Sequence, residues 1–221
     1  AAFGLGFIAG PAIGGILAGP DPLNADFLTP SLVAAGLSLT ALIMAFMLLK
    51  ESLPEDVRQK LADTPPKKRS EQFRAALAKP NVGLLIGLSF LATFVFAGME
   101  TTFAMWSERK FHWGPQQNGY LFAYVGLLVA LIQGGLVGRL VRRFGEANLI
   151  VQGAVALAIG MLLIPFSDGL PMLLIAMAIV AYGFGIITPS MNSLISLQVG
   201  PGEQGGVMGV TRSATTMARV L

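Results

Sequence analysis

Cysteine is absent from this 221-residue sequence, histidine occurs once, and only 12% of the residues are charged. The lack of cysteine excludes disulfide bonds and thiolate metal sites. Soluble domains are usually about 25% charged, so the scarcity of charge argues against a soluble protein. Hydrophobic residues make up 54% of the chain and its mean hydropathy is +0.69, which predicts a chain embedded in a lipid bilayer.

Motifs that carry catalysis or nucleotide binding are also missing. The sequence has no G-x-x-x-x-G-K-S/T, H-E-x-x-H or G-x-S-x-G pattern, and these are typical of phosphate-binding loops, zinc proteases and serine hydrolases. We therefore expect neither an enzyme nor a nucleotide-driven pump, and no cofactor or metal. The net charge of +3 lies mainly in one linker and one short turn, so we expect no nucleic-acid partner.

Long apolar runs divide the sequence. About 20 apolar residues in a helix cross the hydrocarbon core of a bilayer, so these runs predict an all-α membrane protein with six transmembrane helices and part of a seventh. Because the chain begins and ends inside apolar runs, we expect it to be an internal fragment of a longer protein. The runs are Ala1–Pro20, Ser31–Leu49, Asn81–Trp106, Gln116–Gly138, Leu149–Ser167 and Leu170–Val199, and a seventh starts near Val207.

The long polar tract of the sequence is Lys50–Pro80, in which bases exceed acids. Lysine and arginine collect in the cytoplasmic loops of membrane proteins, so we expect this tract to be a cytoplasmic linker. Phe73, Ala76 and Leu77 have helical spacing, which predicts a short amphipathic helix on the membrane surface. The bases are Lys50, Arg58, Lys60, Lys67, Lys68, Arg69, Arg74 and Lys79, and the acids are Glu51, Glu55, Asp56, Asp63 and Glu71.

The first apolar run is rich in glycine. Gly6, Gly10 and Gly14 recur every four residues and therefore line one face of a helix, and Gly15 extends that side. Small residues at this spacing let two helix backbones approach closely in lipid. Pro11 removes one backbone donor and should kink or stiffen the helix. The pattern predicts a close contact between this face and another helix.

A resemblance to a known family begins in the same run. The segment Gly6-Phe7-Ile8-Ala9-Gly10-Pro11-Ala12-Ile13-Gly14-Gly15 resembles the G-x-x-x-G-P-x-x-G-G antiporter signature in the fifth span of major facilitator superfamily drug–proton antiporters. The wider match over residues 3–17, and the segment 203–209, are similar to the tetracycline-resistance efflux branch. The resemblance implies a partial major facilitator helical bundle, from about span five to the start of span eleven. It also implies that the glycines form a tight contact at the interface between two halves.

A short basic turn carries a weaker resemblance. The segment Gly138-Arg139-Leu140-Val141-Arg142-Arg143-Phe144-Gly145 is similar to the superfamily's loop signature, G-x-x-x-D-R-x-G-R-R. It departs from that signature because Arg142 stands where the acid would be and Glu146 where an arginine would be. Three bases in so short a turn predict a cytoplasmic location, and simple anchoring is the interpretation that the residues support.

Four polar residues in the predicted spans are candidate contacts for a substrate or a proton: Glu100, Gln133, Asn192 and Arg212. An acid close to hydrocarbon usually faces a cavity or a partner, so Glu100 is either a cation or proton site or an acid at the wet outer end of its helix. Gln133 is either an amide that joins helices or a substrate contact. Asn192 follows a proline in the sixth run, and Arg212 lies in the seventh.

The resemblance implies three parts of the chain. Residues 1–50 correspond to the last two spans of the N-terminal half, residues 51–80 to the cytoplasmic linker between the halves, and residues 81–221 to a C-terminal half that stops in its fifth span. The partners expected are the lipid bilayer, a small-molecule substrate and the missing N-terminal half of the same protein.

The function that the resemblance implies is secondary active transport. The full protein should export small amphiphilic or cationic drugs in exchange for protons by alternating access, with the proton gradient as its energy source. The expected location is a bacterial inner (plasma) membrane. The alternative is another facilitator, namely an uptake symporter or a uniporter of small solutes.

Overall fold

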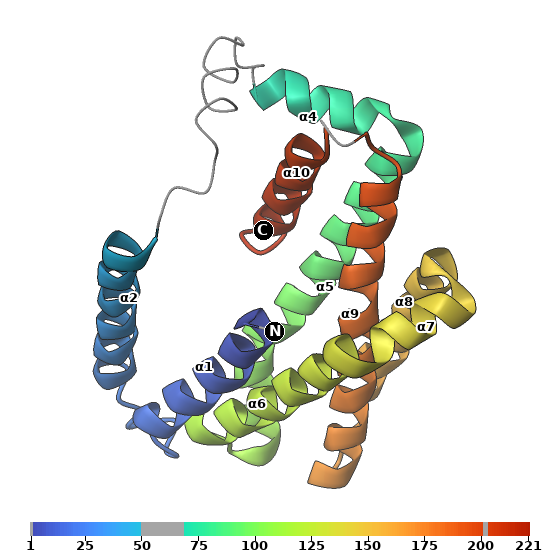
Figure 1. Cartoon of the computed structure of the whole chain (residues 1–221). Helices are drawn as coiled ribbons and strands as arrows, with labels where there is room; N and C mark the ends of the chain where they lie inside the picture. Colours follow the sequence, from blue (N-terminus) through green and yellow to red (C-terminus); the bar gives the residue numbers. More distant parts are fainter. Residues whose placement is uncertain (1, 50–68, 201–202) are drawn as a thin grey trace.

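The computed structural model describes residues 2–49, 69–200 and 203–221, and these ranges are helical without strands (Figure 1). The predictions for residues 50–68 lie outside the described residues. The elements in chain order are α1 (Ala2–Ala18), α2 (Leu28–Leu48), α4 (Arg69–Ala78), α5 (Pro80–Phe111), α6 (Pro115–Leu131), the π-helix η1 (Ile132–Leu136), α7 (Val137–Phe144), α8 (Glu146–Leu163), α9 (Leu170–Leu197) and α10 (Gln204–Met217).

The prediction of an all-α membrane fold is confirmed. Among the residues that the structure describes, five helical stretches are long and apolar enough to cross a bilayer by length and composition. α1 and α10, with 17 and 14 residues, are shorter. The five stretches are Leu28–Leu48, Asn81–Phe111, Pro115–Phe144, Glu146–Leu163 and Leu170–Leu197.

Proline and glycine mark the boundaries of the helices. Pro80 and Pro115 open α5 and α6, where the missing N–H of proline costs no helical hydrogen bond. Gly145, with φ +75°, separates α7 from α8. Glycine can adopt a positive φ without steric penalty because it has no Cβ. The chain can therefore reverse direction at Gly145.

The core of the bundle is built around α9. Leu173, Met177, Val180 and Ile195 of this helix are fully buried, and α5, α6, α8 and α10 all contact it. α8 lies against α9 at Gly183, where a Cβ atom would lie 2.7 Å from the backbone oxygen of Gly153. α9 is therefore the element that places the neighbouring helices relative to one another.

α2 stands apart from this bundle (Figure 1). It contacts α1, and none of its 21 residues is buried. Its large apolar side chains are exposed, Phe46 and Met47 by 84% and 79%. A surface this apolar is stable only in contact with lipid or with other helices.

Ion pairs join elements at both ends of the bundle. Lys79, between α4 and α5, pairs with Glu203 at the start of α10 at 2.6 Å. Lys110, in the last turn of α5, pairs with Asp168 in the turn between α8 and α9 at 2.7 Å. The short helix predicted around Ala76 and Leu77 is present as α4, and it packs on α5 and α10.

Candidate functional site

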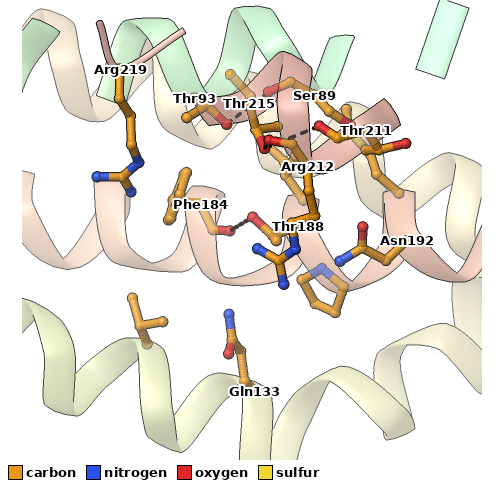
Figure 2. Close-up of a pocket in the computed structure, with 15 residues that line it drawn as sticks. Ser89, Thr93, Gln133, Phe184, Thr188, Asn192, Thr211, Arg212, Thr215 and Arg219 are labelled. Atoms are coloured by element: carbon orange, nitrogen blue, oxygen red, sulfur yellow. Dashed lines mark hydrogen bonds between the residues drawn. The ribbon is translucent and has the colours of Figure 1, made fainter. Parts of the chain in front are cut away.

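A cavity of about 280 Å³ lies among the helices of the bundle. Its walls come from α5, α6, η1, α9 and α10, and from Arg219 just beyond α10 (Figure 2). Val129, Phe184 and Ile187 are among the apolar lining residues. Polar side chains from α5, η1, α9 and α10 line the cavity beside them, and such a mixture is typical of small-molecule sites.

Hydroxyl groups on α5 and α10 line the cavity and are bonded to their own helices. Thr93 Oγ donates to the carbonyl of Ser89 at 2.8 Å, Thr211 Oγ to that of Val207 at 2.9 Å and Thr215 Oγ to that of Thr211 at 3.1 Å. Since each hydroxyl hydrogen is donated within its helix, the oxygen lone pairs remain as acceptors.

A π-helical turn brings Gln133 to the cavity. Residues 132–136 form η1 between α6 and α7, and a single π-turn inside an α-helix is frequently found at functional sites. Gln133 lies in this turn, and its side chain points from η1 toward α9 (Figure 2). Gly134 and Gly135, which follow it, have no atom of another helix within 4 Å of a Cβ position.

Pro189 interrupts the hydrogen bonding of α9 beside the cavity, because proline has no N–H to donate to the carbonyl four residues earlier. Thr188 Oγ donates to the carbonyl of Phe184 at 3.4 Å. The Phe184 ring stacks on Phe96 of α5 with their centroids 4.2 Å apart. This contact holds α9 against α5 where Thr188, Pro189 and Asn192 line the cavity.

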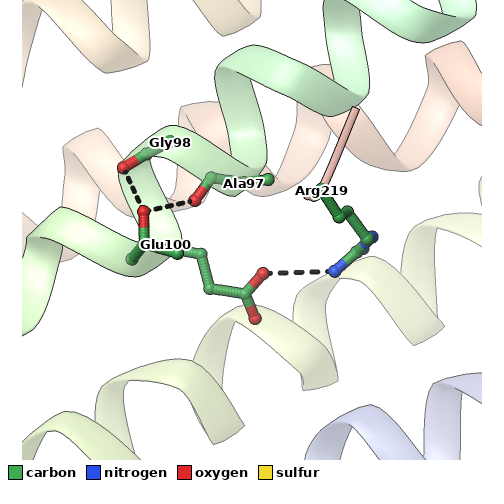
Figure 3. Close-up of polar contacts among 5 residues, drawn as sticks. Ala97, Gly98, Glu100 and Arg219 are labelled. Carbon is green, nitrogen blue, oxygen red and sulfur yellow. Dashed lines mark hydrogen bonds and ion pairs between the residues drawn. The ribbon is translucent and has the colours of Figure 1, made fainter. Parts of the chain in front are cut away.

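Three of the four candidate residues come together in this cavity. Gln133, Asn192 and Arg212 lie on three different elements, and all three line the same space. Glu100 does not line it. Its carboxylate instead pairs with the Arg219 guanidinium at 3.4 Å (Figure 3), and its side chain is 33% exposed.

Sequence reasoning missed the threonines and Arg219 in this lining. Thr211 and Thr215 are four residues apart and therefore share one face of α10, and Arg212 and Arg219 are seven apart. This spacing is the signal that a helical projection of residues 204–221 would have shown. Thr93 in α5 carried no comparable signal, because a lone threonine commonly bonds to its own helix.

The close contact predicted from the glycines of α1 forms at Gly15, which the prediction included, and not at Gly6, Gly10 or Gly14. A Cβ on Gly15 would lie 2.7 Å from the Pro115 oxygen and 2.9 Å from the Gly119 Cα. Gly6, Gly10 and Gly14 have nothing outside their own helix within 4 Å among the described residues. The face of α1 that packs on α6 carries Pro11, Gly15 and Ala18: a Cβ on Gly119 would meet the Pro11 carbonyl and the Gly15 Cα, and Ala18 is buried.

The basic turn keeps its arginines at the surface. Arg139, Arg142 and Arg143 are exposed on α7, and no ion pair among the described residues includes them. Arg142 Nε donates to the carbonyl of Gly138 at 3.2 Å, and the Arg143 guanidinium lies over the Phe144 ring. Glu146 accepts a hydrogen bond from Ser193 of α9 at 3.1 Å, so it joins two helices.

Comparison with known proteins agrees with this architecture. The family model "Major Facilitator Superfamily" matches residues 1–221. The chain is 30% identical to the tetracycline resistance protein, class D, of Salmonella ordonez over 100% of the chain and 53% of that protein. It is 30% identical to the class C protein of Escherichia coli, again over the whole chain and 54% of the relative.

A solved structure shares the fold. The crystal structure of the human organic anion transporter MFSD10 (TETRAN) superimposes with a TM-score of 0.72 at 27% identity, covering 99% of this chain and 53% of that one. The chain thus spans about half the length of the relatives it matches. Because the family model covers every residue, the chain belongs to the major facilitator superfamily.

Proposed function

We propose that the protein containing this chain is a secondary active transporter that exports small amphiphilic molecules in exchange for protons. Two halves of such a protein rock about a central site, so that the site opens to one side of the membrane at a time. In this proposal α1 and α2 belong to the N-terminal half, and α5 to α10 form most of the C-terminal half. The remaining N-terminal spans close the site from the other side.

The observation that carries this proposal is a cavity inside an apolar bundle whose lining includes hydroxyl, amide and guanidinium groups. Thr93 lies 13 residues after Pro80, the start of α5, which is about 20 Å at 1.5 Å per residue. That depth is well inside the hydrocarbon region of a bilayer about 30 Å thick. Polar groups at that depth are costly, and they usually mark a substrate or ion pathway.

The proton gradient is the proposed energy source, with no cofactor. The support is the resemblance of residues 6–15 to the antiporter signature, together with the bacterial relatives that are named tetracycline resistance proteins. Those relatives also support a bacterial inner (plasma) membrane as the location. The relatives' names leave the charge of the substrate open, because they include both tetracycline resistance proteins and an organic anion transporter.

The test is transport by the purified full-length protein in proteoliposomes with an imposed pH gradient. Antiport predicts that a fluorescent amphiphile moves against the direction of proton flow, and that a protonophore stops it. Movement in the same direction as the protons would indicate an uptake symporter. Counterflow that is independent of pH would indicate a uniporter.

A matched pair of variants links transport to the cavity. Gln133→Leu removes the amide that faces the cavity from η1, whereas Gln152→Leu makes the same change on α8, where the side chain does not line it. We expect export to fall at least about tenfold in the first variant, equivalent to one lost hydrogen bond of about 1.4 kcal/mol. Export should be nearly unchanged in the second, and equal losses would contradict the assignment of this cavity.

A further inference from the structure

Among the described residues that line the cavity, the charged side chains are all positive. Arg212 and Arg219 are the charged side chains among its described lining residues, and neither aspartate nor glutamate lines it. A site for a cation normally presents carboxylates or aromatic faces to it. This cavity presents two guanidinium groups and two amides as donors, and the one aromatic ring in the part of its lining that the structure describes is Phe184.

The two arginines differ in their surroundings. Arg219 has a counter-charge within the chain, because it pairs with Glu100 at 3.4 Å (Figure 3). Arg212 forms no ion pair with any residue that the structure describes. Its guanidinium points from α10 into the space between α9 and η1, toward Thr188 and Gln133 (Figure 2).

The Arg212 guanidinium is exposed to the cavity rather than enclosed by neighbouring helices, so it is open to a counter-charge from a bound molecule. Charged groups within a membrane-spanning bundle usually pair with one another or face a pathway for charged solutes. Arginine is always protonated, and its planar fork matches a carboxylate or a similar oxyanion through two parallel hydrogen bonds. The amides of Gln133 and Asn192 line the same space, and amide N–H groups can donate to the same oxyanion.

We propose that Arg212 binds an anionic group of the substrate, a carboxylate or similar oxyanion, in this cavity. The apolar part of the molecule then lies along Phe184, Ile187 and Val129. This inference rests on the proposed transport function and names its substrate class. It replaces the cationic substrates that the sequence resemblance implied with amphiphilic anions.

The test compares two probes with the same xanthene core and opposite charge. Fluorescein is anionic at neutral pH, and rhodamine 123 is cationic. Binding of each to the full-length protein in detergent is measured by fluorescence polarisation. We expect the wild type to bind fluorescein more tightly, and Arg212→Gln to weaken fluorescein binding at least about tenfold, or about 1.4 kcal/mol, without weakening rhodamine 123.

Two further variants control for fold and for net charge. Arg212→Lys keeps the charge but loses the fork, so it should retain part of the fluorescein affinity. Arg109→Gln removes the same charge from an exposed position near the end of α5, away from the cavity, and should leave both affinities unchanged.

Several results would overturn the proposal. One is a failure of the wild-type protein to bind fluorescein, a result that does not depend on whether any variant folds. Another is an equal loss of both probes in Arg212→Gln, and a third is tighter fluorescein binding in that variant, as expected if an acid elsewhere in the full protein occupies Arg212. If fluorescein binds through Arg212 but neither probe moves in proteoliposomes under a pH gradient, the anion site stands and the transport proposal fails.

Discussion

Gly15 of α1 and Gly119 of α6 approach so closely that a Cβ on Gly119 would lie 2.9 Å from the Gly15 Cα and would overlap the Pro11 carbonyl oxygen. The opposing atoms are backbone, which cannot move aside as a flexible side chain can. These two helices are therefore in contact only because both positions lack a side chain.

Gly119→Ala should destabilise the full-length protein by about 1–3 kcal/mol, the usual cost of overpacking. The measurement is the thermal unfolding midpoint in detergent. Gly14→Ala is the matched control, because a Cβ there has no atom of another described helix within 4 Å. A larger loss in Gly14→Ala than in Gly119→Ala would show that the helices pack differently.

The glycine pattern shows what the sequence can and cannot predict. Spacing of four residues identifies a helix face, because helix geometry is local. It does not identify the partner, since Gly14 and Gly15 both continue a small-residue stripe and only α6 distinguishes them. The positions of the spanning helices were predictable because apolar runs mark them, but their lengths were not, since α5 continues beyond the predicted run to Phe111.

The polar candidates show the same limit. Arg212 and Gln133 could be predicted as candidates because a polar group in an apolar run is costly. Their common cavity depends on how α6, α9 and α10 pack, which no local pattern contains. The ion pair between Glu100 and Arg219 could not be predicted either, because the two residues are 119 positions apart in the chain. The π-turn at η1 also had no recognisable signal in the residues that form it.

The Glu100–Arg219 pair should act as a structural link between α5 and the end of α10. Both side chains are partly exposed, at 43% for Arg219 and 33% for Glu100, so the coupling energy is expected to be at most about 1 kcal/mol. A double-mutant cycle with Glu100→Gln and Arg219→Gln, followed by thermal unfolding, measures it.

The Glu100→Gln variant also distinguishes a structural role of Glu100 from a role in binding a cationic substrate. Because Glu100 does not line the cavity, Glu100→Gln should affect rhodamine 123 and a neutral analogue equally in transport. A selective loss of the cationic probe, with no coupling in the cycle, would instead assign Glu100 to substrate binding.

The Lys110–Asp168 pair predicts a pH dependence at the end of the bundle where α5 ends and α9 begins. The hydrogen bond and the positive charge of Lys110 lower the pKa of Asp168 below its ordinary value of 3.8. A carboxylate whose pKa is lowered by folding stabilises the protein above the unfolded pKa, and this stabilisation is lost as the pH falls through the folded pKa.

Asp168→Asn should therefore lower the unfolding midpoint at pH 7, and the difference from wild type should disappear as the pH falls through the folded pKa, which lies below 3.8. The difference should also shrink at high salt, because the Asp168 side chain is 91% exposed to solvent and the pair is therefore screened. A difference that persists unchanged at low pH would mean that the ion pair is not its cause.

Two buried serines should respond in opposite directions to the same substitution. Ser107 Oγ donates to Asn118 Oδ1 at 2.8 Å and joins α5 to α6. Ser190 of α9 is fully buried, and its Oγ has no hydrogen-bond partner in the described part of the chain. A hydroxyl buried without a partner costs free energy, whereas one that satisfies a buried amide stabilises the fold.

Ser107→Ala should lower the stability by about 1–3 kcal/mol, because it removes the partner of a buried amide oxygen. Ser190→Ala removes a hydroxyl that gains no bond on folding, so it should be neutral or raise the stability by up to about 1 kcal/mol. Thermal unfolding of both variants of the full-length protein in the same detergent measures the difference. Destabilisation by Ser190→Ala as large as that by Ser107→Ala would mean that Ser190 has a partner in the full-length protein, because a hydroxyl that lacks one loses nothing when it is removed.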